Sequence, residues 1–309
     1  MGLSFYSEDN TSISLKVTNK TWDGTLEYSY DNSTWNTFNA GTTYSGLNIY
    51  LRGTGNTTIS YLNGVIWELT ITGTRIHCDG NIQSLLDYNS PSTSVSTRCY
   101  SAMFYNCSSL ITAPSLPATT LAGGCYQFMF FGCTALTSAP SLPATTLANY
   151  CYFTMFFGCT ALTTAPSLPA TTLASGCYSH MFNGCTGLTS APSLPATTLA
   201  YYCYYFMFYN CTALTSAPSL PATTLAEGCY SGMFNGCTGL TSAPSLPATT
   251  STGGCYQSMF KYCSSLTTAP SLPATTLADY CYESMFFGCT SLITAPSLPA
   301  TTLANYCYQ

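Results

Sequence analysis

A strict 26-residue repeat constrains this chain more than any other feature of its sequence. One series of cysteines falls at positions 99, 125, 151, 177, 203, 229, 255, 281 and 307. A second series runs from 107 to 289, each member eight residues after one of the first. The unit reads CYxxMFxGCTxLTxAPSLPATTLAxx, with eight full copies and a partial ninth. Self-similarity at such a period is typical of a solenoid, in which each unit packs only against its neighbours.

The spacing of constant residues within the unit predicts a helix. Counted from the first cysteine, Cys, Tyr, Met, Phe, Cys and Leu occupy positions 1, 2, 5, 6, 9 and 12. At 100° per residue these positions share one side of a helix, and the positions that vary between copies lie on the other. The two prolines of PSLPATT exclude a helix there, so a short strand near LTxAP and an extended return should follow. The sequence therefore predicts an α/β, leucine-rich-repeat-like solenoid of helix–strand repeats over 99–309, with the six constant side chains inward.

The first quarter of the chain has a different texture. Short segments rich in β-branched and aromatic residues, such as SISLKVTN, NIYLRGTG and VIWELTITGT, alternate with Asn, Asp and Gly. This pattern predicts a small all-β sandwich at residues 1–74. A solenoid needs a cap over its first apolar face, and residues 75–98 are predicted to form that N-terminal cap.

Two of the units resemble a known class of repeats. MFNGCTGLTSAPSLPATTL at 181–199 and MFFGCTSLITAPSLPATTL at 285–303 resemble BspA-like leucine-rich repeats. The resemblance covers about residues 99–309, although the unit here is slightly longer than usual and has a second proline. Such repeats occur in bacterial surface adhesins and gut phage proteins, so the resemblance implies binding rather than catalysis.

Low charge excludes several kinds of partner. Charged residues make up only 6% of the chain, against about 25% in an ordinary soluble domain. The six Lys and Arg residues are too few for the basic clusters that bind nucleic acid or an anionic membrane surface. The sequence contains no run of about 18 apolar residues, so membrane insertion is not expected. The N-terminus also lacks the basic start and apolar core of a secretory signal.

The residues that support catalysis are scarce. The 18 cysteines are predicted to be reduced thiols that fill small spaces in the core, with some bridging, chiefly at Cys78, left open. Their eight-residue spacing does not match the short loops of zinc sites. Two histidines, His77 and His180, are present, and no paired carboxylates, phosphate loop or Ser-His-Asp set occurs. We therefore expect no enzyme activity, no metal and no cofactor.

The varying positions of the unit indicate recognition instead. They hold Tyr, Phe, Asn, Ser and Gly, an amino-acid composition similar to that of antibody paratopes. Drift on a solvated face would bring in Lys and Glu, whereas these positions gain aromatic rings. The predicted ligand-binding residues, expected to share one surface on the outer helical face, are Tyr150, Phe153, Phe157, Tyr201, Tyr202, Tyr205, Phe206 and Tyr209.

The sequence thus predicts a non-enzymatic recognition or adhesion protein for a cell-surface protein or glycan, with a homo-oligomer contact as another use of the same face. An extracellular or surface-exposed location is expected, and the missing signal favours a virion, such as a phage tail, over a bacterial cell surface. The first alternative is a structural spacer or lattice-forming subunit. A remote one is an ice-binding solenoid that uses the threonines of PSLPATT, although adjacent threonines on a strand should face opposite sides.

Overall fold

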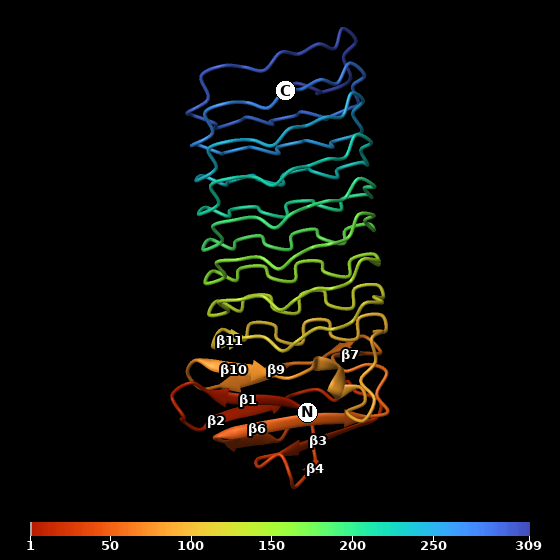
Figure 1. Ribbon diagram of the computed structural model, residues 1–309, viewed down its shortest axis with the longest axis vertical. Coiled ribbons are helices and arrows are strands. Elements are labelled where there is room, and N and C mark those ends of the chain that lie inside the picture. Colours follow the sequence, from red (N-terminus) through yellow and green to blue (C-terminus); the bar gives the residue numbers. More distant parts are fainter. Residues whose placement is uncertain (1) are drawn as a thin grey trace.

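The computed structural model describes residues 2–309 and shows β-sheets at one end of a tall stack of flat coils (Figure 1). A six-stranded sheet has the order β11-β10-β1-β6-β3-β4, a three-stranded sheet the order β5-β2-β9, and β7 and β8 form a hairpin. Neighbouring strands are antiparallel except β10 and β11, which are parallel. The strands are β1 (Leu3–Ser7), β2 (Ile13–Val17), β3 (Thr25–Ser29), β4 (Asn36–Thr37), β5 (Thr43–Gly46), β6 (Asn48–Thr54), β7 (Tyr61–Leu62), β8 (Val65–Ile66), β9 (Leu69–Thr72), β10 (Ile76–Asp79) and β11 (Leu110–Thr112), and a short 3-10 helix, η1, spans Ile82–Leu85.

The two larger sheets bury one face each in a common core. Alternate residues of β1 and β2 are buried, as the two-residue period of a strand requires. Phe5 of β1 and Leu15 of β2 are completely buried in the same apolar cluster, together with Trp67, which is 1% exposed. The β-rich, sandwich-like character predicted for the first part of the chain is confirmed.

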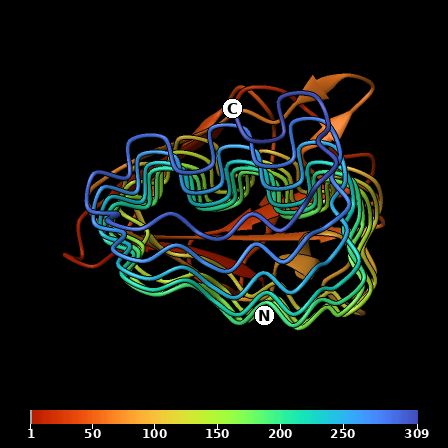
Figure 2. The ribbon, with the colours of Figure 1, turned by 90° about the horizontal axis from the view of Figure 1, so that it is seen from above.

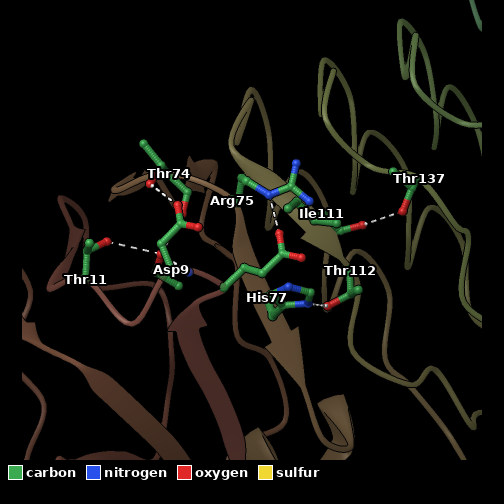
Figure 3. A network of polar contacts seen from close by, with 10 residues as sticks. Asp9, Thr11, Thr74, Arg75, His77, Ile111, Thr112 and Thr137 are labelled. Atoms are coloured by element: carbon green, nitrogen blue, oxygen red, sulfur yellow. Dashed lines mark hydrogen bonds and ion pairs between the residues drawn. The ribbon is translucent and has the colours of Figure 1, made fainter.

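The first coil is joined directly to the six-stranded sheet. Strand β11 lies in that coil and pairs with β10, where His77 Nδ1 lies 3.2 Å from Thr112 Oγ1 (Figure 3). The next coil is tied in by Thr137 Oγ1, which donates to the Ile111 carbonyl at 3.4 Å. On the same side of the sheet Arg75 pairs with the Glu8 carboxylate. The apolar cluster also runs from the sheets into the coils without a break, so the sandwich closes the first apolar face of the stack.

The prediction of an α/β, leucine-rich-repeat-like solenoid built from helix–strand repeats is wrong. No α-helix forms anywhere in residues 99–309, and each CYxxMFxGC segment is a succession of turns. The Met129 amide donates to the Tyr126 carbonyl three residues back, whereas the next amide, that of Phe130, donates to Met155 in the following coil at 2.9 Å. In an α-helix both would donate four residues back along the same segment. Half of these amides therefore connect coils.

Left-handed residues explain why no helix forms. Every fourth residue of the turn segment has a positive φ, for example Phe128 at 57° and Gly132 at 69° in one coil and Thr154 at 57° and Gly158 at 69° in the next. Such residues interrupt a right-handed helix. A period of four and a helical period of 3.6 select the same constant positions over nine residues, so the spacing alone did not separate the two structures.

The inward placement of the six constant residues is confirmed. In the second copy, Cys125, Tyr126, Met129, Phe130, Cys133 and Leu136 are at most 1% exposed. Equivalent rings stack in columns through successive coils, with 5.9 Å between the Tyr126 and Tyr152 centroids and 5.5 Å between those of Phe130 and Phe156. Seen along the stack, the coils overlie one another and one long side undulates, as recurring turns require (Figure 2).

Of the strands predicted near LTxAP in each repeat, only β11 forms in the described residues. In other coils isolated parallel bridges take their place. Ser138 bridges Thr164, which bridges Ser190, and Thr120 bridges Thr146 in the PSLPATT segment. Both members of the pair Thr119 and Thr120 are exposed. Neither threonine of this pair is therefore buried in the core.

Candidate recognition surface

The turn geometry decides which side chains reach the outside of the coils. Each four-residue turn buries its two constant side chains in the core. Large side chains at varying positions 3, 4 and 7 and at the two positions before the first cysteine stay at least partly exposed, whereas small ones such as Thr154 and Asn183 are buried. All eight predicted ligand-binding residues occupy such positions, and none is buried. Tyr150 and Tyr201 are the most open, at 45% and 47% exposed. They lie on turns rather than on the predicted helical face.

His180 connects the two groups of predicted residues. The Phe153 ring packs edge-on against the His180 ring, with 6.0 Å between their centroids. The Phe206 ring stacks on the same imidazole, with 5.5 Å between the centroids. Tyr205 also packs edge-on against His180 at 5.2 Å and against Tyr202 at 4.7 Å. Rings two coils apart are thus joined through the coil between them, which the sequence-based list omitted.

A second row of rings runs beside the first. Phe131 stacks between Tyr105 at 4.7 Å and Phe157 at 4.6 Å, and Phe128 links this row to Phe153 at 5.3 Å. Phe128 and Phe131 occupy varying positions of the second copy but are not among the eight predicted ligand-binding residues. We call the whole connected set the aromatic strip; its members are Tyr105, Phe128, Phe131, Tyr150, Phe153, Phe157, His180, Tyr201, Tyr202, Tyr205, Phe206 and Tyr209.

The aromatic strip carries no charge at neutral pH. The sequence has no Asp, Glu, Lys or Arg from 99 to 226. Burial lowers the pKa of His180 below its usual 6.5, because desolvation disfavours the charged imidazolium. The amide Nδ2 of Asn183 lies 3.0 Å from His180 Nδ1, and since an amide nitrogen only donates, Nδ1 accepts. Desolvation also raises the pKa of Tyr202 above 10.0, so its phenol keeps its proton.

Glycines mark the end of the strip that lies farther from the sandwich. A Cβ atom added at Gly232 would lie 2.6 Å from the Phe206 ring, so a larger residue there would displace that ring. Gly228 gives the Tyr202 ring the same room. Charges appear at this end of the strip: Glu227 directly precedes Gly228 and lies near Tyr202, and farther along the Lys261 ammonium lies 5.1 Å from the Phe287 ring centroid. The strip is a bounded patch and not a property of every coil.

The cysteines are structural groups in this fold. All eighteen are free and buried. Burial raises the pKa of the Cys151 thiol from 9.0 to about 12, and it also raises the pKa of the Cys78 thiol. A nucleophilic cysteine needs the opposite shift, because the thiolate is the reactive form. Among the residues from 2 to 309, no group of three or more His, Cys, Asp or Glu side chains is placed to hold a metal ion.

Comparisons with known proteins return no match: no protein-family model, no curated protein and no solved structure matches this chain. The resemblance to BspA-like repeats therefore rests on the quoted units alone, and the helix predicted from the spacing of the constant residues is absent. No helix in the described part of the chain is long and apolar enough to cross a bilayer.

Proposed function

We propose that this chain is a non-enzymatic recognition protein and that its aromatic strip binds a protein or glycan on a cell surface. The observation that carries the proposal is the connected set of outward rings at positions that vary between otherwise constant repeats. Large rings at varying outward positions supply contact area at a low cost in side-chain entropy. A monomer usually hides such apolar area unless a partner covers it.

The packing of the rings favours a preorganised surface. Tyr202, Tyr205 and Phe206 contact one another edge-on, with centroids 4.7 and 4.6 Å apart. Rings held by their neighbours have little freedom left to lose when a ligand binds, so more of the contact energy remains for affinity. Tyrosine hydroxyl groups at the rim would supply the hydrogen bonds that orient a partner.

We further propose that the protein acts on the outside of a virion or cell. Eighteen free thiols are typical of chains that fold in a reducing compartment, whereas secreted proteins usually pair their cysteines. A phage tail protein folds in the host cytoplasm before it is exposed, which favours the virion over the bacterial surface. The partner contacts would then be made after release.

The proposal is tested by attachment of the purified chain to panels of bacterial and epithelial cells. The double variant Tyr205→Ala/Phe206→Ala should reduce attachment at least tenfold while the melting temperature changes little, because both side chains lie outside the core. Phe287→Ala is the matched control, since Phe287 is an exposed ring, 57% accessible, away from the strip. Equal attachment of all three proteins would contradict the proposed role.

A rigid spacer is the second candidate, favoured by the unbroken columns of rings that run through the coils. Deletion of residues 255–280 removes one repeat and leaves the strip intact. A recognition protein should tolerate that deletion, whereas a spacer should lose its role when its length changes.

A further inference from the structure

A notch opens on the surface of the coils at the end of the aromatic strip that lies farther from the sandwich. Its volume is about 430 Å³, and its lining comes from four successive coils. The lining includes Tyr202, Glu227, Gly253, Asp279 and Tyr280. Tyr202 is also a member of the aromatic strip, so a partner that lies on the strip can reach the notch.

Glycines leave this space open. Tyr202 and Tyr280 occupy the same position of the repeat, directly before the first cysteine, and glycine holds that position in the two coils between them. One position earlier, Gly253 separates Glu227 from Asp279 in the same way. Two aromatic rings and two carboxylates therefore border a gap in the rows of outer side chains.

The two carboxylates are placed at the notch by different contacts. The Glu227 side chain lies beside the open position at Gly253, where an added Cβ atom would be 3.6 Å from Glu227 Cγ and 3.9 Å from its carboxyl carbon. Asp279 Oδ1 accepts a hydrogen bond from the Asn305 backbone amide at 2.9 Å, which holds the second carboxylate in position. Neither carboxylate takes part in the two ion pairs found within residues 2–309.

No basic side chain of the coils offsets this charge. Lys261 is the one basic residue between 99 and 309, and its ammonium lies 5.1 Å from the Phe287 ring centroid, outside the notch lining. A third acidic residue, Glu283, accepts a hydrogen bond from the side chain of Gln257, which also lines the notch. The notch thus combines uncompensated negative charge with two aromatic rings, and it suits a cation that has apolar surface.

We infer that the notch binds a quaternary ammonium group such as that of choline. The negative faces of aromatic rings attract a cation, and the carboxylates add to that attraction. A quaternary ammonium group carries methyl groups and no N–H, so it needs ring contact and negative charge but no hydrogen-bond acceptor. A lysine ammonium has three N–H groups that need acceptors. A calcium ion takes about six to eight oxygen ligands, more than two carboxylates supply.

This inference goes beyond the proposed function, because it assigns a ligand to a site beside the strip and is tested without a cell. The full chain is titrated by calorimetry with choline, with its uncharged isostere 3,3-dimethyl-1-butanol, with butylammonium and with calcium chloride. We expect choline to bind most tightly, about tenfold more tightly than the isostere. Equal binding of the isostere, tighter binding of butylammonium or calcium, or no binding of choline overturns the inference.

Variants then locate the site. Glu227→Gln and Asp279→Asn keep the shape of each side chain and remove its charge, and the double variant should weaken choline binding at least tenfold. Glu68→Gln is the matched control, because Glu68 is exposed and lies outside the notch. Gly253→Leu keeps both charges and fills the notch, so it should also abolish binding. Gly253 has an ordinary φ, so the backbone accepts a leucine there.

The outcomes for the notch and for the strip are separable. Normal choline binding by both the charge double variant and Gly253→Leu overturns the notch as the binding site. If Tyr205→Ala/Phe206→Ala reduces cell attachment while the unmodified chain binds no choline, the notch inference fails and the proposed function stands. If choline binds at the notch while that variant attaches normally, the notch inference stands and the proposed function fails.

Discussion

The sandwich and the coils bury their cores in different ways. In the sandwich the buried side chains make contacts that are not repeated along the chain. Trp22, for example, packs against Phe38 and edge-on against Trp67, with ring centroids 5.8 and 6.0 Å apart. In the coils the same tyrosine, phenylalanine, methionine and cysteine recur in columns. Thirteen of the seventeen charged residues of the chain precede residue 99, so the coils also lack the charged surface of the sandwich.

The difference teaches how a repeat separates stability from recognition. When the inner residues of each coil are fixed by the column above and below, the outer positions can change without repacking the core. Phe206 and Gly232 occupy equivalent positions in neighbouring coils with the same backbone conformation, at φ 49° and 62°. The sandwich has no such freedom, because a change in one strand alters contacts that occur nowhere else.

The largest expected effect comes from alkaline pH, which should unfold the coils before the sandwich. Burial raises the pKa of thiols such as Cys159 and Cys203 from 9.0 to about 12, and the coils hold seventeen of the eighteen cysteines. Above about pH 9 the unfolded chain loses these thiol protons while the folded chain keeps them. The unfolded state then binds fewer protons, so stability is intact below pH 9 and falls as pH rises toward 12.

Mass spectrometry after brief iodoacetamide treatment maps this loss residue by residue. At pH 8 the native thiols should stay unmodified, and near pH 10.5 the coil cysteines should react before Cys78, which lies on β10 in the sandwich. Reaction of Cys78 first would show that the sandwich is the weaker part and would reverse the comparison.

The next effect concerns where a core defect is felt. Phe182→Ala removes a ring stacked between Phe156 and Phe208, each 5.6 Å away, and Phe38→Ala removes a ring from the sandwich. Each should lower the free energy of unfolding by about 3–5 kcal/mol. Hydrogen exchange should then show Phe182→Ala opening nearby coils while β1 and β6 stay protected. Uniform loss of protection in both variants would mean that the two regions unfold as one unit.

The sequence predicted the repeat, the inward residues and the β-rich first region, because these depend on burial, and burial leaves a periodic pattern. It did not predict the coil backbone. Positions 1, 2, 5, 6 and 9 fit a four-residue turn as well as a helix. Backbone hydrogen bonds between coils require no particular side chain, so the residue pattern of one repeat does not reveal them. One signal was available: Gly132, Gly158 and Gly184 recur where a helix would be weakened by about 1 kcal/mol each.

The outward rings of the candidate surface were predicted for a similar reason. Variation among constant repeats marked Tyr205 and Phe206, whatever the backbone. The link through His180 depends on how far rings in neighbouring coils lie apart, which only the fold supplies. The surface hollow between the sandwich and the coils, lined by Ile66 and Tyr105, could not be predicted at all, because these residues come from different regions of the chain.

The smallest effect gives the sharpest test of the coil backbone, because turns and helices predict opposite signs. Gly158 has φ of +69°, and a Cβ there would meet only the Gly132 Cα, at 4.0 Å, so Gly158→Ala adds backbone strain without a clash. We expect it to lower the free energy of unfolding by about 1 kcal/mol, since a left-handed alanine costs about 1–2 kcal/mol. In a helix the same change would raise stability by about 0.8–1 kcal/mol. Gly253→Ala is the matched control, because Gly253 has an ordinary φ and room for a Cβ 3.6 Å from Glu227 Cγ. Urea denaturation of the two variants measures the sign of the change in the free energy of unfolding. A stabilising Gly158→Ala would contradict the turn backbone and support a helix at this position.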